Sequence, residues 1–320
     1  MKGIYYDGSQ ARLRRDLPVP RAKPGHSLIK VKYANVCSTD REILKGYRPD
    51  FQGVMGHEFV GTVTETDNPD LKGKLVVGEL NTGCGQCWYC SHGLEKHCQT
   101  RTAIGIDGAD GCFAQYLVLP DHLIHVVPEG LAPEQAVFAE PLAAALEITQ
   151  QVHIRPDSRV AVTGDGRLAL LCAQVLALTG CDLTVFGKHE EKLGLFADFA
   201  QTQLTSQVPE GSLDPDSQYD VVVDCTGHPS GLQLAGRLVR HRGTIVLKST
   251  FAGDAPVNMS YFVVNEITIT GSRCGPFEPA LRLLQKGMVH LPPIELFRME
   301  DFEEAFTSPA FKAGFAPEDE

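Results

Sequence analysis

The sequence predicts an α/β protein with two domains, one β-rich and the other built on a doubly wound parallel sheet. Its 320 residues correspond to about two domains of typical size. Between residues 28 and 119 the chain has short alternating segments separated by frequent glycines, which is typical of a β-rich unit. From residue 159 onward, strand-like and helix-like segments take turns, which indicates parallel strands joined by helices. We therefore expect one domain at 1–145 and 275–320, and the other at 146–274.

In the β-rich part, the segments 27–33 and 59–64 alternate polar and apolar residues and are predicted as strands. The segment 133–152 is rich in Ala, Leu, Glu and Gln, and it predicts a helix that leads into the second domain. Beyond Gly275 the strand–helix alternation ends, and we expect the chain to return and complete the first domain.

The elements of the second domain follow in a regular series. The predicted helices and strands are helices at 167–178 and 190–200, strands at 159–163, 182–186, 220–225, 244–247 and 266–270, and a weak strand within 204–216.

The overall composition excludes several classes of protein. Hydrophobic residues at 43% and charged residues at 22% are ordinary for a globular chain. The formal net charge of -11 repels phosphate backbones, so nucleic acid is not an expected partner. We find no apolar run long enough to span a membrane and no signal peptide, and we expect a cytoplasmic protein. In that compartment, ten cysteines indicate metal binding or chemistry before disulfides.

The strongest local signal is a run of four cysteines, Cys84, Cys87, Cys90 and Cys98. Two-residue gaps let a loop fold around one ion, and four thiolates complete a tetrahedral zinc site. Because such a site has no open position, we expect a structural role. An iron–sulfur cluster is the main alternative, since clusters also use Cys-x2-Cys runs.

A second metal site is a hypothesis that combines Cys37, His57 and Glu140, which lie far apart in the sequence. One thiolate, one imidazole and one carboxylate leave a fourth zinc position open for water or substrate, as in catalytic sites. We expect Glu58 to be an exchange ligand or a neighbour of the ligands, and Asp40 to hold the His57 ring by its other nitrogen. Taken alone, a single cysteine is more often a small buried apolar residue, and a single histidine more often lies on the surface or packs in the core.

Residues 160–169 predict a strand, a glycine turn and a helix start that fit the pattern G-x-G-x-x-A. Gly164 permits the tight turn, Gly166 lets the backbone approach a pyrophosphate, and Ala169 lets the helix pack closely. A plain tight turn is the alternative, but the first strand–helix junction of the series favours dinucleotide binding. Further residues expected at the cofactor are Arg167, Leu168, Thr226, Ser249 and Arg273, the last with a structural ion pair as its alternative.

The end of the second strand of this domain bears on the form of the cofactor. An NAD site usually has Asp or Glu there, but the strand ends in Gly187, Lys188 and His189, none of which carries a carboxylate. Lys188 can meet a 2′-phosphate, His189 can donate a hydrogen bond, and Gly187 leaves room for that group. We therefore expect NADP rather than NAD, with a solvated loop as the alternative.

Together these motifs resemble the medium-chain, zinc-containing alcohol dehydrogenase family over nearly the whole chain. The Glu140-Pro141 pair is more similar to the sorbitol and threonine dehydrogenase branch than to the simple alcohol branch. The matching segments are Cys37-Ser38-Thr39-Asp40, Gly56-His57-Glu58, the four-cysteine run, Glu140-Pro141-Leu142-Ala143, the Gly164 turn and Asp224-Cys225-Thr226-Gly227.

The resemblance implies a GroES-like catalytic domain, a Rossmann domain and two zinc ions per chain. It implies a structural zinc at the four cysteines and a catalytic zinc at Cys37, His57 and Glu140, with Glu58 interchanging. The implied reaction is hydride transfer between NADP(H) and an alcohol or polyol, or the matching carbonyl compound, with Thr39 passing the proton outward. A homodimer or homotetramer is also implied, and the segment 265–270 is predicted as an edge strand that pairs with a second copy.

Two positions depart from the family pattern. Glu42 stands where the family often has a histidine that relays protons, so the outer relay is in doubt. The segment 311–320 lacks the usual closing strand of a lysine and apolar residues, and we expect a shortened or frayed end. Two other functions remain open: an NADP-dependent reductase with only the structural zinc, and a non-catalytic NADP-binding regulatory protein.

Overall fold

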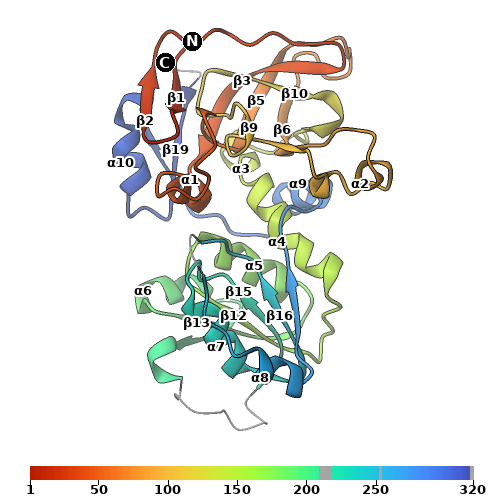
Figure 1. Ribbon diagram of the computed structural model, residues 1–320, viewed down its shortest axis with the longest axis vertical. Helices are drawn as coiled ribbons and strands as arrows, with labels where there is room; N and C mark the ends of the chain where they lie inside the picture. Colours follow the sequence, from red (N-terminus) through yellow and green to blue (C-terminus); the bar gives the residue numbers. More distant parts are fainter. Residues whose placement is uncertain (209–217, 252–253, 318–320) are drawn as a thin grey trace. The chain divides into compact units, whose positions relative to one another are not determined.

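The computed structural model describes residues 1–208, 218–251 and 254–317. The chain forms two compact units, one of residues 1–140 and 277–320 and the other of residues 141–276. Both ends of the chain belong to the first unit, as the red and blue elements of Figure 1 show. The boundary expected after residue 145 falls inside a helix, α4 (Ala139–Gln151). No helix in the described ranges is long and apolar enough to cross a membrane.

The first unit is organised around a seven-stranded sheet with the strand order β11-β6-β5-β3-β19-β18, in which β10 also pairs with β3. The predicted strands at 27–33 and 59–64 are the two central strands, and they pair antiparallel. The strands of this sheet are β3 (His26–Asn35), β5 (Glu58–Glu65), β6 (Leu75–Gly78), β10 (Tyr116–Pro120), β11 (Ile124–Val126), β18 (Ile294–Phe297) and β19 (Lys312–Phe315).

Smaller elements complete this unit. Two three-stranded sheets consist of β1 (Gly3–Tyr6), β2 (Ala11–Arg14) and β4 (Gly53–Val54), and of β7 (Asn81–Thr82), β8 (Thr102–Ile104) and β9 (Gly108–Ala109). Its helices are α1 (Ser38–Ile43), α2 (Trp88–Ser91), α3 (Pro133–Ala136), α9 (Phe277–Gln285) and α10 (Phe302–Thr307).

The C-terminal segment closes the main sheet, so the expectation of a shortened or frayed end was wrong. Strand β19 pairs with β18 on one side and with β3 on the other, and all four of its residues are buried. Phe315 packs edge-on against Phe113, with ring centroids 5.1 Å apart. The sequence pattern did not reveal this strand, because Lys312 would be expected to face solvent but is buried like Ala313 and Phe315.

The second unit has a six-stranded parallel sheet with the order β14-β13-β12-β15-β16-β17. Counted along the unit, this is the order 3-2-1-4-5-6, so the predicted doubly wound sheet is confirmed. Its strands are β12 (Arg159–Thr163), β13 (Asp182–Gly187), β14 (Gln201–Leu204), β15 (Tyr219–Asp224), β16 (Val239–Leu247) and β17 (Thr268–Gly271). Its further helices are α5 (Arg167–Ala177), α6 (Glu190–Leu193), α7 (Ser230–Leu238) and α8 (Met259–Val264).

Three predicted elements differ in extent. The helix expected at 133–152 is divided into α3 and α4 by a turn at Val137 and Phe138, both of them buried. The helix expected at 190–200 ends at Leu193, where Gly194 begins a single 3₁₀ turn. The weak strand expected within 204–216 was placed too late, because β14 spans Gln201–Leu204 and shares only Leu204 with that range; residues 209–216 lie outside the described part.

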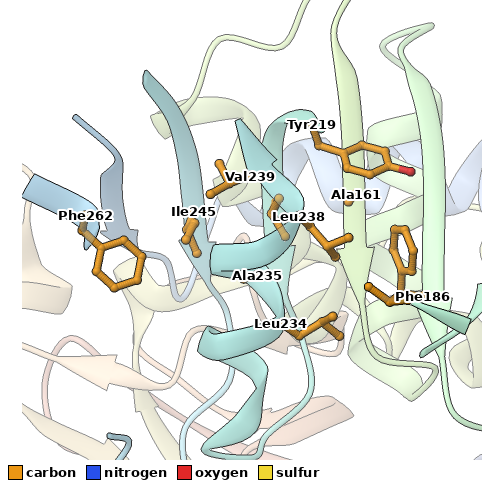
Figure 2. Close-up of a cluster of buried hydrophobic side chains, with 11 residues drawn as sticks. Ala161, Phe186, Tyr219, Leu234, Ala235, Leu238, Val239, Ile245 and Phe262 are labelled. Atoms are coloured by element: carbon orange, nitrogen blue, oxygen red, sulfur yellow. The ribbon is translucent and has the colours of Figure 1, made fainter. Parts of the chain in front are cut away.

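Helix α7 packs against the parallel sheet with its apolar face. Figure 2 shows Leu234 and Leu238, one helical turn apart, together with Ala161 and Phe186 of the neighbouring strands. The ring of Tyr219 meets Phe186 edge-on, with centroids 5.7 Å apart. Each fully buried side chain of this size stabilises the fold by about 1.5–3 kcal/mol, so the strands and their carboxyl ends are firmly held.

Candidate active site

The glycine turn after β12 has the geometry that dinucleotide binding requires. Gly164 has a φ of +112°, and a Cβ there would lie 2.9 Å from the carbonyl oxygen of Cys225, so only glycine fits. A Cβ at Gly166 would meet nothing within 4 Å, so the backbone is open to a ligand. Gly166 also caps helix α5, whose first amides are available to an anion.

Arg167 gives a second sign of an anion site at this turn. Its Nη1 is buried and has no hydrogen-bond partner among the described residues. A buried guanidinium nitrogen without an acceptor is costly, and a pyrophosphate oxygen would satisfy it. The open backbone and the unpaired donor therefore fit a dinucleotide. Leu168 follows in the same turn of the helix and is half-buried.

The other predicted cofactor residues follow the carboxyl ends of the parallel strands. Thr226 comes after β15, and its amide donates to Oδ1 of Asp224 at 2.9 Å. Ser249 follows β16, and the exposed Arg273 follows β17. Because parallel strands end at one edge of a sheet, these residues share the edge of the Gly164 turn.

Lys248 is a residue at this edge that sequence reasoning missed. Its ammonium is buried and donates to the carbonyl oxygen of Ala144 at 2.6 Å and to the hydroxyl of Ser272 at 3.2 Å. A lysine after a strand is usually exposed, so the sequence carries no signal of its burial.

The end of β13 differs from the expectation in one respect. The sequence places no carboxylate there, but the side chain of Asp165, from the glycine turn, reaches this strand end. Its Oδ2 accepts from the amides of Lys188 at 2.7 Å and His189 at 2.8 Å. A Cβ on Gly187 would lie 2.8 Å from the Cβ of Asp165, so the missing side chain at Gly187 makes room for this carboxylate. The sequence signal that could have predicted this contact is Asp165 itself, which stands between the two glycines of the G-x-G pattern.

The four cysteines of the predicted structural site lie together in the first unit. The Sγ atoms of Cys84, Cys87, Cys90 and Cys98 are all within 4.8 Å of one another. The amide of Cys84 donates to Sγ of Cys98 at 3.4 Å. Hydrogen bonds from the hydroxyl of Thr100 and from this amide lower the pKa of Cys98 to about 6, whereas burial and a hydrogen bond with Cys87 raise the pKa of Cys90 to about 12. Thiolates at this spacing fit a zinc ion with four sulfur ligands.

A second group of metal-ligating atoms is formed by Cys37, His57 and Glu58, again within 4.8 Å of one another. Cys37 precedes helix α1, while His57 and Glu58 stand at the start of β5. Strand pairing brings them together, because Asn35 at the end of β3 lies opposite Glu58. His57 and Glu58 are buried, and Cys37 is half-buried.

Asp40 gives this group its electrostatic character. Its Oδ2 accepts from the Cys37 amide at 2.7 Å, and its Oδ1 faces Nδ1 of His57 at 3.4 Å. Neither Asp40 Oδ1 nor His57 Nδ1 has a hydrogen bond among the described residues. Burial disfavours charge on the ring, but Asp40 and Cys37 outweigh it and raise the pKa of His57 well above its usual value. Asp40 and Cys37 thus favour a cation at the ring, and a zinc ion bound here would take the place of the ring proton.

Lys312 is a further charged neighbour that sequence reasoning missed. Its ammonium forms an ion pair with the Glu58 carboxylate, and the two side chains are only 3% and 1% exposed. The ammonium also lies 5.8 Å from the ring centroid of Phe138. Glu58 is thus held between a fixed cation on β19 and the Cys37–His57 pair.

The remaining predicted residues lie at different distances from this group. The hydroxyl of Thr39 is 3.9 Å from Sγ of Cys37. Glu42, at the relay position, accepts from Lys45 at 2.7 Å. Glu140, in the first turn of α4, is outside the group formed by Cys37, His57 and Glu58. Its part as a zinc ligand stays a prediction, while Glu58, the expected exchange ligand, is the carboxylate that lies with Cys37 and His57.

Comparison with known proteins agrees with this geometry. Residues 23–129 match the model of the alcohol dehydrogenase GroES-like domain, and residues 168–286 match that of zinc-binding dehydrogenases. The chain is 29% identical over 320 residues to a sorbitol dehydrogenase of Halalkalibacterium halodurans, a match that covers 93% of this chain and 92% of the relative.

Two solved structures resemble the whole chain at 26% identity, each with 99% of both chains covered. One is a zinc-binding dehydrogenase of Sinorhizobium meliloti 1021 bound to NADP, with a TM-score of 0.88. The other is an alcohol dehydrogenase of Escherichia coli CFT073 complexed with NADH, with a TM-score of 0.86.

Proposed function

The chain belongs to the zinc-type medium-chain dehydrogenases/reductases, and from this premise we propose that it transfers a hydride between a nicotinamide cofactor and an alcohol or polyol, or the matching ketone or aldehyde. The observation that carries the proposal is the buried group of Cys37, His57 and Glu58 beside Asp40. Three protein ligands leave one zinc position for a substrate oxygen, whereas the four-cysteine group leaves none. The polyol class is supported by the likeness to a sorbitol dehydrogenase.

The chemistry divides between the bound groups and the protein. When bound, zinc supplies Lewis acidity to the substrate oxygen and the nicotinamide supplies the place that accepts or donates the hydride. Cys37 and His57 would hold the metal together with one carboxylate, and Glu58 and Glu140 are proposed to exchange in that third place. Asp40 orients the His57 ring, and the Thr39 hydroxyl takes up the alcohol proton. The Glu42–Lys45 pair then replaces the family's usual histidine on the way to solvent.

The cofactors follow from the same geometry. We propose two zinc ions per chain, one at each group of ligands. The dinucleotide is proposed to lie on the Gly164 turn, with Arg167 as the pyrophosphate contact. The expectation of NADP is supported by the exposed side chains of Lys188 and His189. The carboxylate of Asp165 at the same strand end weighs against NADP.

We propose that two copies pair through the edge of the parallel sheet. Strand β17 is the last in the sheet, and β16 pairs with it on one side. Met259, Val263 and Val264 of α8 and Ile269 of β17 are exposed by 37–78%. An unpaired edge beside exposed apolar residues is suited to a two-fold contact, which makes a homodimer the basic assembly. The ten cysteines, all in the described part of the chain, form no disulfide, which fits a reducing compartment, so we propose that the protein lies in the cytoplasm.

One set of measurements on the purified protein tests the proposal. A panel of alcohols, polyols and carbonyl compounds is scored by nicotinamide absorbance, and zinc is counted in the same sample. We expect turnover and two zinc ions per chain. Turnover with one zinc ion would favour the reductase that has only the structural zinc. No turnover across the panel, with dinucleotide still bound, would favour the regulatory protein. Light scattering should give a dimer, and a monomer would contradict the edge contact.

A further inference from the structure

Asp165 occupies the end of β13 with a well-fixed carboxylate. One oxygen, Oδ2, accepts three hydrogen bonds, two from the amides of Lys188 and His189 and one from Nδ1 of His189 at 3.0 Å. The side chain is 12% exposed. Burial disfavours the charge, but the hydrogen bonds from His189 and Lys188 outweigh it and lower the pKa of Asp165 below its usual value. The group is therefore an anion at neutral pH.

In a doubly wound sheet, the end of the second strand recognises the adenosine ribose of a dinucleotide. A carboxylate there accepts hydrogen bonds from ribose hydroxyls, whereas a 2′-phosphate needs donors. The amides of Lys188 and His189 are the backbone donors at this place, and both are directed to Asp165. A 2′-phosphate would have to compete for these donors and come close to a fixed negative charge.

The unused oxygen of Asp165 completes the argument. None of the three hydrogen bonds involves Oδ1, so this atom has lone pairs for a ribose hydroxyl. The side chain of Lys188 is exposed, and water and salt screen its attraction for a phosphate. We infer that Asp165 is the specificity-determining residue of the cofactor site and that it selects NAD over NADP. This inference rests on the proposed dinucleotide function.

The test measures nucleotide binding directly, so that it does not depend on finding a substrate. Isothermal titration of the zinc-loaded protein with NAD⁺ and NADP⁺ is repeated with Asp165→Asn, which removes the charge at nearly constant shape. Asp165→Gly additionally frees the two amides. Asp182→Asn serves as a matched control, because Asp182 is an exposed aspartate at the start of the same strand. Circular dichroism checks that each variant is folded.

We expect the unmodified protein to bind NAD⁺ at least tenfold more tightly than NADP⁺. The preference should shrink several-fold in Asp165→Asn, shrink further or reverse in Asp165→Gly, and stay unchanged in Asp182→Asn. Tighter binding of NADP⁺ by the unmodified protein would overturn the inference while leaving the proposed function intact. An unchanged preference in folded Asp165→Asn would also overturn it. Failure of both nucleotides to bind would instead overturn the proposed function, and the inference with it.

Discussion

The two groups of metal ligands in the first unit are built in opposite ways. The four-cysteine group comes from one stretch of 15 residues, Cys84 to Cys98, and Cys84 is exposed. The group of Cys37, His57 and Glu58 comes from separate elements and is largely buried. The first group offers only sulfur ligands, whereas Asp40 and Lys312 place fixed charges beside the second.

This contrast separates a metal that holds a loop from a metal that performs chemistry. Four thiolates satisfy zinc completely, and little else is needed around them. A site with an open position must keep its ligands in place without the metal's full set of bonds, so neighbouring charges and hydrogen bonds orient them.

The largest effect is expected from the removal of one ligand of the buried group. Cys37→Ala should lower turnover of any accepted alcohol on the order of 1,000-fold, because Lewis-acid stabilisation of several kcal/mol is lost and each 1.36 kcal/mol is a factor of ten. The measurement is steady-state turnover, together with zinc content, which should fall from two ions to one.

Cys181→Ala is the matched control, because Cys181 is a half-buried thiol of the second unit that belongs to neither ligand group. It should keep its activity and both zinc ions. Unchanged turnover in Cys37→Ala would contradict the catalytic role of the buried group. This conclusion would hold whether or not the four-cysteine site keeps its zinc.

The next effect concerns Lys312, which neutralises Glu58 inside the protein. In Lys312→Met without zinc, a buried carboxylate loses its partner, and the free energy of unfolding should fall by about 3 kcal/mol. With zinc the loss should be smaller, because the dication then balances the charge of Glu58. Urea unfolding with a chelator and with excess zinc measures both values.

The double variant Lys312→Met, Glu58→Gln removes both charges and should regain part of the stability without zinc. If Lys312→Met lowered the free energy of unfolding equally with and without zinc, the charge of Glu58 would not be balanced by a bound metal. The buried group would then be an ordinary ion pair beside a cysteine and a histidine.

The four-cysteine group should show the reverse profile, with an effect on stability first. Cys90→Ser should lose one zinc ion, and the free energy of unfolding should fall by about 2.7 kcal/mol when free zinc is about 100 times its Kd. Activity of the folded fraction should persist. If Cys90→Ser kept its full stability but lost its turnover, the four-cysteine group would have the catalytic role instead. Thermal unfolding and turnover on the same sample decide the point.

The same contrast explains how far the sequence reaches. The four cysteines are predicted because their contacts are local, and the Gly164 turn because its strand, turn and helix follow in order. The buried group depends on the pairing of β3 with β5 and of β19 with β3, which no local pattern specifies. Lys312 was therefore missed, and the sequence could not decide whether Glu58 or Glu140 lies with Cys37 and His57. Asp165 was missed because its hydrogen bonds join two strand ends 23 and 24 residues apart in the chain.

The smallest effect is expected from Asp40, which contacts the His57 ring without being among the three ligands. Asp40→Asn keeps an acceptor for the Cys37 amide but removes the charge that faces the imidazole. Loss of such an orienting carboxylate typically costs about 10- to 100-fold in metal affinity, so zinc should dissociate more readily from the buried group alone. Competition with a chromophoric chelator measures the two zinc affinities.

Glu95→Gln is the matching change at the other group, because Glu95 accepts from the Gly83 amide at 2.6 Å beside the cysteines. We expect it to change the affinity of the four-cysteine site less than Asp40→Asn changes that of the buried site, since four thiolates orient themselves around zinc. If Asp40→Asn and Glu95→Gln instead lowered the zinc affinity of their groups by the same factor, neighbouring charges would be equally important for the open site and for the enclosed four-cysteine site. The difference in construction between the two groups would then not be a difference in function.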